Sequence, residues 1–258
     1  MTPHRYFTLV TEAALTDGRP LGEALAQSSR AAPPAPNPVL SAIRLLQAGD
    51  QRAGLEALAP IGLDPLLVEA ALLHPGSARS VRERLAAIPE HFPTLFALRG
   101  MLAYLLVVFV VQMGLLAVVN QKVLPPLLHQ AAPAGGVPGI AQAMGWATLL
   151  AQAGALLCFA GLTGWGVRLL LRASLRSQER ARLFAAAAGI ATVAPGAETA
   201  RFLTAHPEIT GLGTAPGAAV LDELAGQHGR LSLLQAERVI GSVKVGGTVA
   251  ALLVAGLA

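Results

Sequence analysis

The sequence is poor in cysteine, in aromatic residues and in charge. Its 258 residues include one cysteine, Cys158, so no disulfide can form within the chain. Aromatic residues make up 4% of the chain and charged residues 13%, whereas an ordinary soluble domain is about 25% charged. Hydrophobic residues make up 53%. These values exclude a disordered chain, a coiled coil and a disulfide-stapled secreted domain, and the abundant alanine and leucine favour helices.

The net charge of +4 is too small to indicate a nucleic-acid-binding protein. Its distribution along the chain is more informative. Residues 1–99 contain nine arginines and nine acidic residues, and the basic excess follows later, beside the apolar stretches. Basic residues in that position set the orientation of membrane helices.

Three apolar stretches are predicted to cross a membrane. Residues 101–119 carry no charge and would form about 28 Å of helix, close to the roughly 30 Å hydrocarbon core of a bilayer. Residues 143–167 are also uncharged and have Trp146 and Trp165 near their ends, as interfacial aromatic residues do. Residues 240–258 contain one charge, Lys244, which can extend to the headgroups. We therefore predict spans at 100–120, 143–167 and 240–258.

Arginine placement predicts the orientation of these spans. The connecting loop 121–142 has a single basic residue, Lys122. Five arginines follow the second span, namely Arg168, Arg172, Arg176, Arg180 and Arg182. Because cytoplasmic loops are enriched in arginine and lysine, we expect the N-terminus and residues 168–239 in the cytoplasm and the loop 121–142 outside. Residues 1–15 lack the apolar core of a secretory signal.

The segments 1–99 and 168–239 are predicted to be two cytoplasmic helical domains. In the first, Asp50, Asp64 and Ser77 are expected to cap helices that start after them, and six short helices can close a small core. In the second, a long helix at 169–187 is followed by short helices at 197–205 and 221–225. The predicted fold is an all-α membrane protein: a cytoplasmic bundle, a two-span hairpin, a shorter second cytoplasmic segment and a C-terminal span.

Four stretches carry a resemblance to a known family: LVTEAALTDGRPLGEAL at 9–25, Ala103-Tyr104, Val123-Leu124-Pro125, and ERVIGSVKVGGTVAALLVAGLA at 237–258. The chain resembles the type II secretion F family, the inner-membrane platform proteins of type II secretion and type IV pilus machines. It departs from the family in having Tyr104-Leu105 where Tyr-Pro is usual, and in lacking the acid of the usual Gly-Glu turn at His74-Pro75-Gly76-Ser77. A short, divergent member is expected.

The resemblance implies a non-catalytic scaffold in the bacterial inner membrane, multi-pass, with a cytoplasmic N-terminus. Its implied partners are an assembly ATPase, pilin or pseudopilin subunits and other inner-membrane machine components. Small residues at four-residue spacing, such as Ala147, Ala151 and Ala155, fit either packing within one chain or a homo-oligomer.

No catalytic, metal or cofactor site is predicted. The six histidines are scattered without metal-ligand spacing, and no phosphate-binding loop is present. The five arginines at 168–182 are interpreted as an anchor on anionic lipid or as a docking surface for an acidic partner. An alternative function is a small transporter or channel subunit that uses the intramembrane residues Gln112, Gln152 and Lys244. Hydrogen bonding between helices is the simpler role for those residues.

Overall fold

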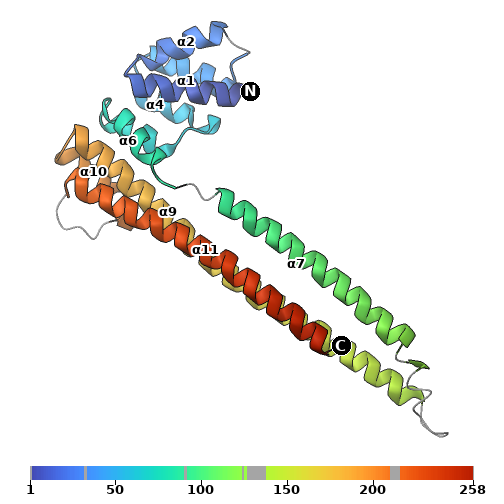
Figure 1. The fold of residues 1–258 in the computed structure, drawn as a ribbon. Coiled ribbons are helices and arrows are strands. Elements are labelled where there is room, and N and C mark those ends of the chain that lie inside the picture. Colours follow the sequence, from blue (N-terminus) through green and yellow to red (C-terminus); the bar gives the residue numbers. More distant parts are fainter. Residues whose placement is uncertain are drawn as a thin grey trace. The chain divides into compact units, whose positions relative to one another are not determined.

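The computed structural model describes residues 2–31, 34–89, 92–123, 125–126, 138–209 and 216–257. Within these ranges the regular elements are helices and there is no strand, as the composition predicts (Figure 1). The chain divides into two compact units. Unit 1 comprises Met1–Pro89 and Arg176–Leu231, and unit 2 comprises Glu90–Leu175 and Ser232–Ala258. Two long helices, α9 (Pro138–Val193) and α11 (Ala218–Leu257), contribute residues to both units.

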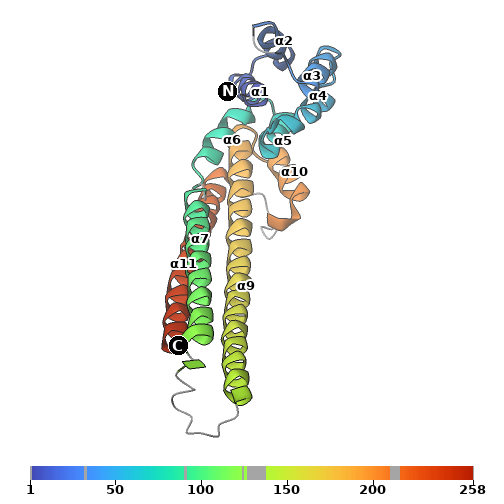
Figure 2. The ribbon, with the colours of Figure 1, turned by 90° about the vertical axis from the view of Figure 1, so that its right-hand side faces the viewer.

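The beginning of unit 1 has a small core of its own. Its helices are α1 (Pro3–Asp17), α2 (Leu21–Ala31), α3 (Asn37–Gln47), α4 (Gln51–Ala57) and the 3-10 turn η1 (Ala59–Ile61). The buried side chains that they share include Phe7, Leu25, Val39, Leu58 and Ile61. Figure 2 labels the four helices α1, α2, α3 and α4.

A second core in unit 1 joins segments that are distant in sequence. Helices α5 (Pro65–Leu73) and α6 (Ser77–Ala86) pack against the end of α9, α10 (Ala197–Ala205), the 3-10 turn η3 (Pro207–Ile209) and the start of α11. Val81, Ile190, Phe202 and Leu221 are among its fully buried side chains. The first six helices therefore do not close one core, because α5 and α6 bury their apolar faces against later helices.

Two of the three predicted helix caps are present in the structure. Asp50 and Asp64 cap α4 and α5, accepting hydrogen bonds from the amides of Ala53 and Leu66 at 3.0 and 3.1 Å, so both predicted caps are confirmed. The predicted cap Ser77 is wrong. Its hydroxyl donates backwards to the carbonyls of Ala70 and His74, at 2.7 and 2.8 Å, and caps no amide of α6.

Unit 2 consists of α7 (Phe92–Val118), the π-helical turn η2 (Val119–Val123) and the remaining parts of α9 and α11. Its buried core is formed by Leu98 of α7 with Val239 and Val243 of α11, and α9 contributes Val167 and Leu171 at its edge. The buried Ser174 hydroxyl donates to the Ser232 carbonyl at 2.8 Å, which ties α9 to α11.

The helix predicted at 221–225 is not separate, because it is the first part of the continuous helix α11. Within the part of the chain that the structure describes, no helix is long and apolar enough to cross a membrane. The side chains of Gln112, Gln152 and Cys158 lie outside the described residues, as does 127–137 of the predicted loop.

Candidate functional site

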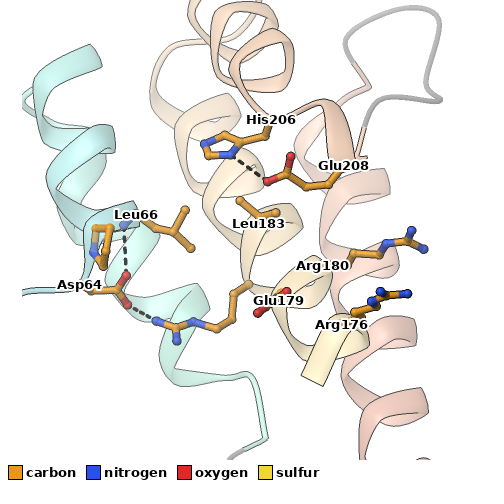
Figure 3. A pocket seen from close by; sticks show the side chains of 10 residues that line it. Asp64, Leu66, Arg176, Glu179, Arg180, Leu183, His206 and Glu208 are labelled. Carbon is orange, nitrogen blue, oxygen red and sulfur yellow. Dashed lines mark hydrogen bonds and ion pairs between the residues drawn. The ribbon is translucent and has the colours of Figure 1, made fainter. Parts of the chain in front are cut away.

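Unit 1 contains a cleft of about 530 Å³. It lies between the start of α5, residues 176–183 of α9, and the corner where α10 meets η3 (Figure 3). Three lining residues are apolar, namely Pro65, Leu66 and Leu183. The others are charged or titratable: Asp64, Arg176, Glu179, Arg180, Arg182, His206 and Glu208. The cleft therefore presents fixed charge of both signs beside an apolar surface.

Asp64 connects two sides of the cleft. One carboxylate oxygen caps α5 through the Leu66 amide, and the other forms an ion pair with the Arg182 guanidinium of α9. Both side chains are partly exposed, at 21% for Asp64 and 43% for Arg182. A partly exposed pair of this kind contributes about 1 kcal/mol or less to stability, so its main effect is to hold Arg182 at the α5 end of the cleft.

His206 ends α10 and lies between two carboxylates. Its Nε2 is 2.9 Å from Glu69 Oε2 and its Nδ1 is 3.3 Å from Glu208 Oε1. The ring can donate at both nitrogens only when it is protonated. The pKa of Glu208 is lowered, first by the hydrogen bond from its own backbone amide and then by the His206 ring. His206 thus bridges Glu69 of α5 and Glu208 of η3 beside the cleft.

Arg176 and Arg180 differ from Arg182, which pairs with Asp64. Both are exposed, and within the described residues neither forms an ion pair or a hydrogen bond. The two arginines stand four residues apart on α9, and in Figure 3 both side chains point away from Glu179 and from Asp64. The cleft therefore has one neutralised arginine and two adjacent arginines that are available to an anion.

His228 of α11 is a titratable neighbour of these arginines. Its ring stacks on Phe184 with a centroid distance of 5.5 Å, and its Nδ1 is buried without a hydrogen-bond partner among the described residues. The pKa of His228 is lowered, mainly by burial and then by the charge of Arg180. Both effects favour the neutral ring.

The five arginines singled out in the sequence are thus placed as follows. Arg176, Arg180 and Arg182 line the cleft in unit 1, whereas Arg168 and Arg172 are exposed in unit 2. Sequence reasoning missed the acidic and histidine residues of the site, because it identified Asp64 only as a helix cap and the scattered histidines only as unsuited to a metal site. The contacts of Asp64 and His206 reach across 118 and 137 residues, and nothing in the local sequence indicates them. Among the described residues, no group of three or more His, Cys, Asp and Glu side chains is placed to hold a metal ion.

Unit 2 has a different surface, made of exposed apolar side chains. On α7, Leu106 is 64% exposed and Leu115 61%, and on α9 Leu150 is 71% and Trp165 63% exposed. The same two helices expose further large apolar side chains: Tyr104, Val107, Val110, Val111, Val118, Trp146 and Leu157. Soluble monomers rarely expose an apolar surface of this extent, which marks a contact with a partner or a membrane.

Comparisons with known proteins give no further assignment. No family model matches the chain, and no significant match is found among curated proteins or solved structures.

Proposed function

We propose that this protein is a non-catalytic inner-membrane platform of a type II secretion or type IV pilus assembly machine. It would couple a cytoplasmic assembly ATPase to the polymerisation of pilin or pseudopilin. The observation that carries the proposal is the exposed apolar surface of α7 and α9 in unit 2. Each exposed leucine forgoes roughly 1.5–3 kcal/mol of burial free energy, so such a surface is expected to be covered.

A bilayer is the cover that fits the sequence of these helices best. Most of the exposed apolar side chains of α7 fall within residues 101–119, which carry no charge over nearly the thickness of a hydrocarbon core, and Leu95 and Phe96 precede this stretch. Those of α9 fall mainly within residues 143–167, which are uncharged as well. Arg168 and Arg172 follow immediately and would contact anionic lipid headgroups on the cytoplasmic side.

Unit 1 would be the part of the platform that meets cytoplasmic partners. It buries its own apolar side chains in two cores, and its surface carries a cleft with fixed charges. The resemblance of residues 9–25 and 237–258 to the type II secretion F family favours an assembly ATPase as that partner and pilin-like subunits as partners of unit 2. Transmission of ATPase motion through α9 and α11 would then bias the extraction of subunits from the bilayer.

The experiment is a cross-linked pull-down of the tagged, full-length protein from native membranes, identified by mass spectrometry. We expect an assembly ATPase and pilin-like subunits to be enriched over a pull-down with an unrelated tagged protein of the same membrane. A tagged variant with Leu106→Asp and Leu115→Asp on α7 should lose the pilin-like subunits. Recovery of a transporter complex, or of neither kind of partner, would contradict the platform function.

A further inference from the structure

We propose that Arg176 and Arg180 form the docking site for an acidic segment of a cytoplasmic partner protein. Carboxylate side chains of that segment would bind the two guanidinium groups at the side of the cleft. The inference deepens the proposed function, on which it depends for the cytoplasmic location of unit 1.

Within the described ranges, some charged side chains of the cleft have a partner of opposite charge and others do not. Arg182 is neutralised by Asp64, and Glu208 lies against His206. Arg176, Arg180 and Glu179 are left, and Figure 3 shows the two guanidinium groups directed away from the Glu179 carboxylate. Two adjacent cations repel each other, and a carboxylate placed between them would remove that repulsion.

Among the described residues, no acidic side chain pairs with Arg176 or Arg180. Residues 210–215, which follow η3, read Thr-Gly-Leu-Gly-Thr-Ala and contain no acid. A carboxylate that neutralises these two arginines would therefore come from another molecule.

The form of the site favours a protein segment over a lipid surface. The arginines border a cleft of about 530 Å³ that is also lined by Pro65, Leu66 and Leu183. A peptide can insert apolar side chains beside its carboxylates, whereas a flat headgroup layer cannot follow a concave surface. Guanidinium groups also suit carboxylates particularly well, because their planar fork donates hydrogen bonds to both carboxylate oxygens at once.

The first test uses a fluorescently labelled hexaglutamate peptide and the full-length protein in detergent micelles at low ionic strength. Fluorescence anisotropy should show that hexaglutamate binds to the native protein. Labelled hexaglutamine, which carries no side-chain charge, should not bind. The double variant R176Q/R180Q should bind hexaglutamate at least about tenfold more weakly, since each lost charge-assisted hydrogen bond costs about that factor or more.

The matched control is the double variant R44Q/R201Q. Arg44 and Arg201 are exposed, do not line the cleft, and their replacement lowers the net charge equally. We expect R44Q/R201Q to bind hexaglutamate as tightly as the native protein does. The melting temperatures of R44Q/R201Q and R176Q/R180Q should both equal that of the native protein. Equal weakening in the two double variants would reduce the effect to net charge and overturn the proposal, as would absence of binding to the native protein.

Competition distinguishes a protein segment from other anions. Inorganic phosphate and dihexanoyl-phosphatidylserine, at matched ionic strength, should displace the labelled peptide far less effectively than unlabelled hexaglutamate. Displacement by either at the same concentration would mean a general phosphate or headgroup site and overturn the proposal.

Binding of the peptide should also raise the pKa of His228, measured by NMR, because a carboxylate bound to Arg180 offsets the charge of that arginine. Peptide binding without that rise would place the peptide elsewhere.

The two proposals can fail separately. Peptide binding at Arg176 and Arg180 without an ATPase in the pull-down would keep the docking site and contradict the platform function. Recovery of an ATPase in the pull-down without peptide binding would support the platform function and overturn the docking site.

Discussion

Gly189 of α9 lies directly against Val81 of α6. A Cβ built on Gly189 would be 2.6 Å from Val81 Cγ2 and 2.7 Å from Val81 Cα. Real Cβ atoms do not approach backbone atoms so closely, and the backbone of Val81 cannot rotate away. The contact shows why α6 belongs to the core formed with α9, α10 and α11 rather than to the core of the first four helices.

Replacement of Gly189 by alanine should destabilise unit 1. We expect Gly189→Ala to lower the free energy of unfolding by about 1–3 kcal/mol, because the added methyl group overpacks the contact with Val81. Gly226→Ala is the control: it is also helical, meets nothing within 4 Å, and should gain about 0.5–1 kcal/mol from helix propensity. Thermal unfolding of the full-length protein in detergent measures both, and equal effects would contradict the close approach.

Arg84 connects three helices of unit 1. Its Nη2 donates to Thr192 Oγ1 at 3.0 Å and lies 3.0 Å from Asp222 Oδ2. We expect Arg84→Met to cost about 1–2 kcal/mol, because it removes a partly buried charged hydrogen bond. Arg79→Met, on the same helix, breaks only the exposed pair with Glu83 and should cost about 0.5 kcal/mol or less. If the two variants unfold at the same temperature, Arg84 does not hold these helices together.

Asp64 has two roles that can be separated by substitution. Asp64→Ala removes both the cap of α5 and the ion pair with Arg182, whereas Asp64→Asn keeps a capping oxygen and removes the ion pair. We expect the alanine variant to be less stable than the asparagine variant by about 1 kcal/mol, the usual value of an N-cap. Adding Arg182→Gln to Asp64→Asn should have little further effect. A large additional loss in this denaturation series would mean that Arg182 has another partner.

Some of this architecture was predictable because the signals are local. Asp64-Pro65 sets the start of α5, and His206-Pro207 sets the end of α10, from adjacent residues alone. The prediction for Ser77 was wrong because a serine at the start of a helix can either cap the helix or donate to a preceding carbonyl. The neighbouring His74 side chain accepts the Gly76 amide at 3.2 Å. The division into cores was not predictable, since α5 and α6 have apolar faces that fit either set of neighbours.

The same distinction applies to the candidate site. The spacing of Arg176 and Arg180 indicated a basic helix face, and both lie on the cleft. Arg182 belongs to the same run of five arginines, but it stands two residues beyond Arg180 and meets Asp64 from α5. Only the tertiary structure could separate a neutralised arginine from two available ones.

Stability should fall on mild acidification because of His228. Burial and Arg180 lower its pKa from the ordinary value of 6.5, so below about pH 6.5 the unfolded chain binds more protons than the folded one. Unfolding is therefore favoured as the pH falls from about 6.5 toward the lowered pKa of the folded state. His228→Phe, which can keep the stacking on Phe184, should lose less stability between pH 7.5 and pH 5.5.

The control for this titration is His4→Phe, at an exposed position of α1. Its melting temperature should follow the native pH dependence. The lowered pKa of Glu208 acts in a separate window: its contribution is complete above the ordinary value of 4.5 and is lost as the pH falls through the lowered pKa. A His228→Phe variant as acid-sensitive as the native protein would contradict the burial of this ring.

The most direct test of the membrane-platform account is cysteine labelling in intact native membranes, with Cys158 replaced by alanine. Leu106→Cys on α7 and Leu157→Cys on α9 are compared with Arg52→Cys, an exposed position of α4. The account predicts that a membrane-impermeant maleimide labels Arg52→Cys once the membrane is opened, whereas Leu106→Cys and Leu157→Cys react only after denaturation in sodium dodecyl sulfate. Labelling of the α7 and α9 positions at the same rate as Arg52→Cys before denaturation would contradict it.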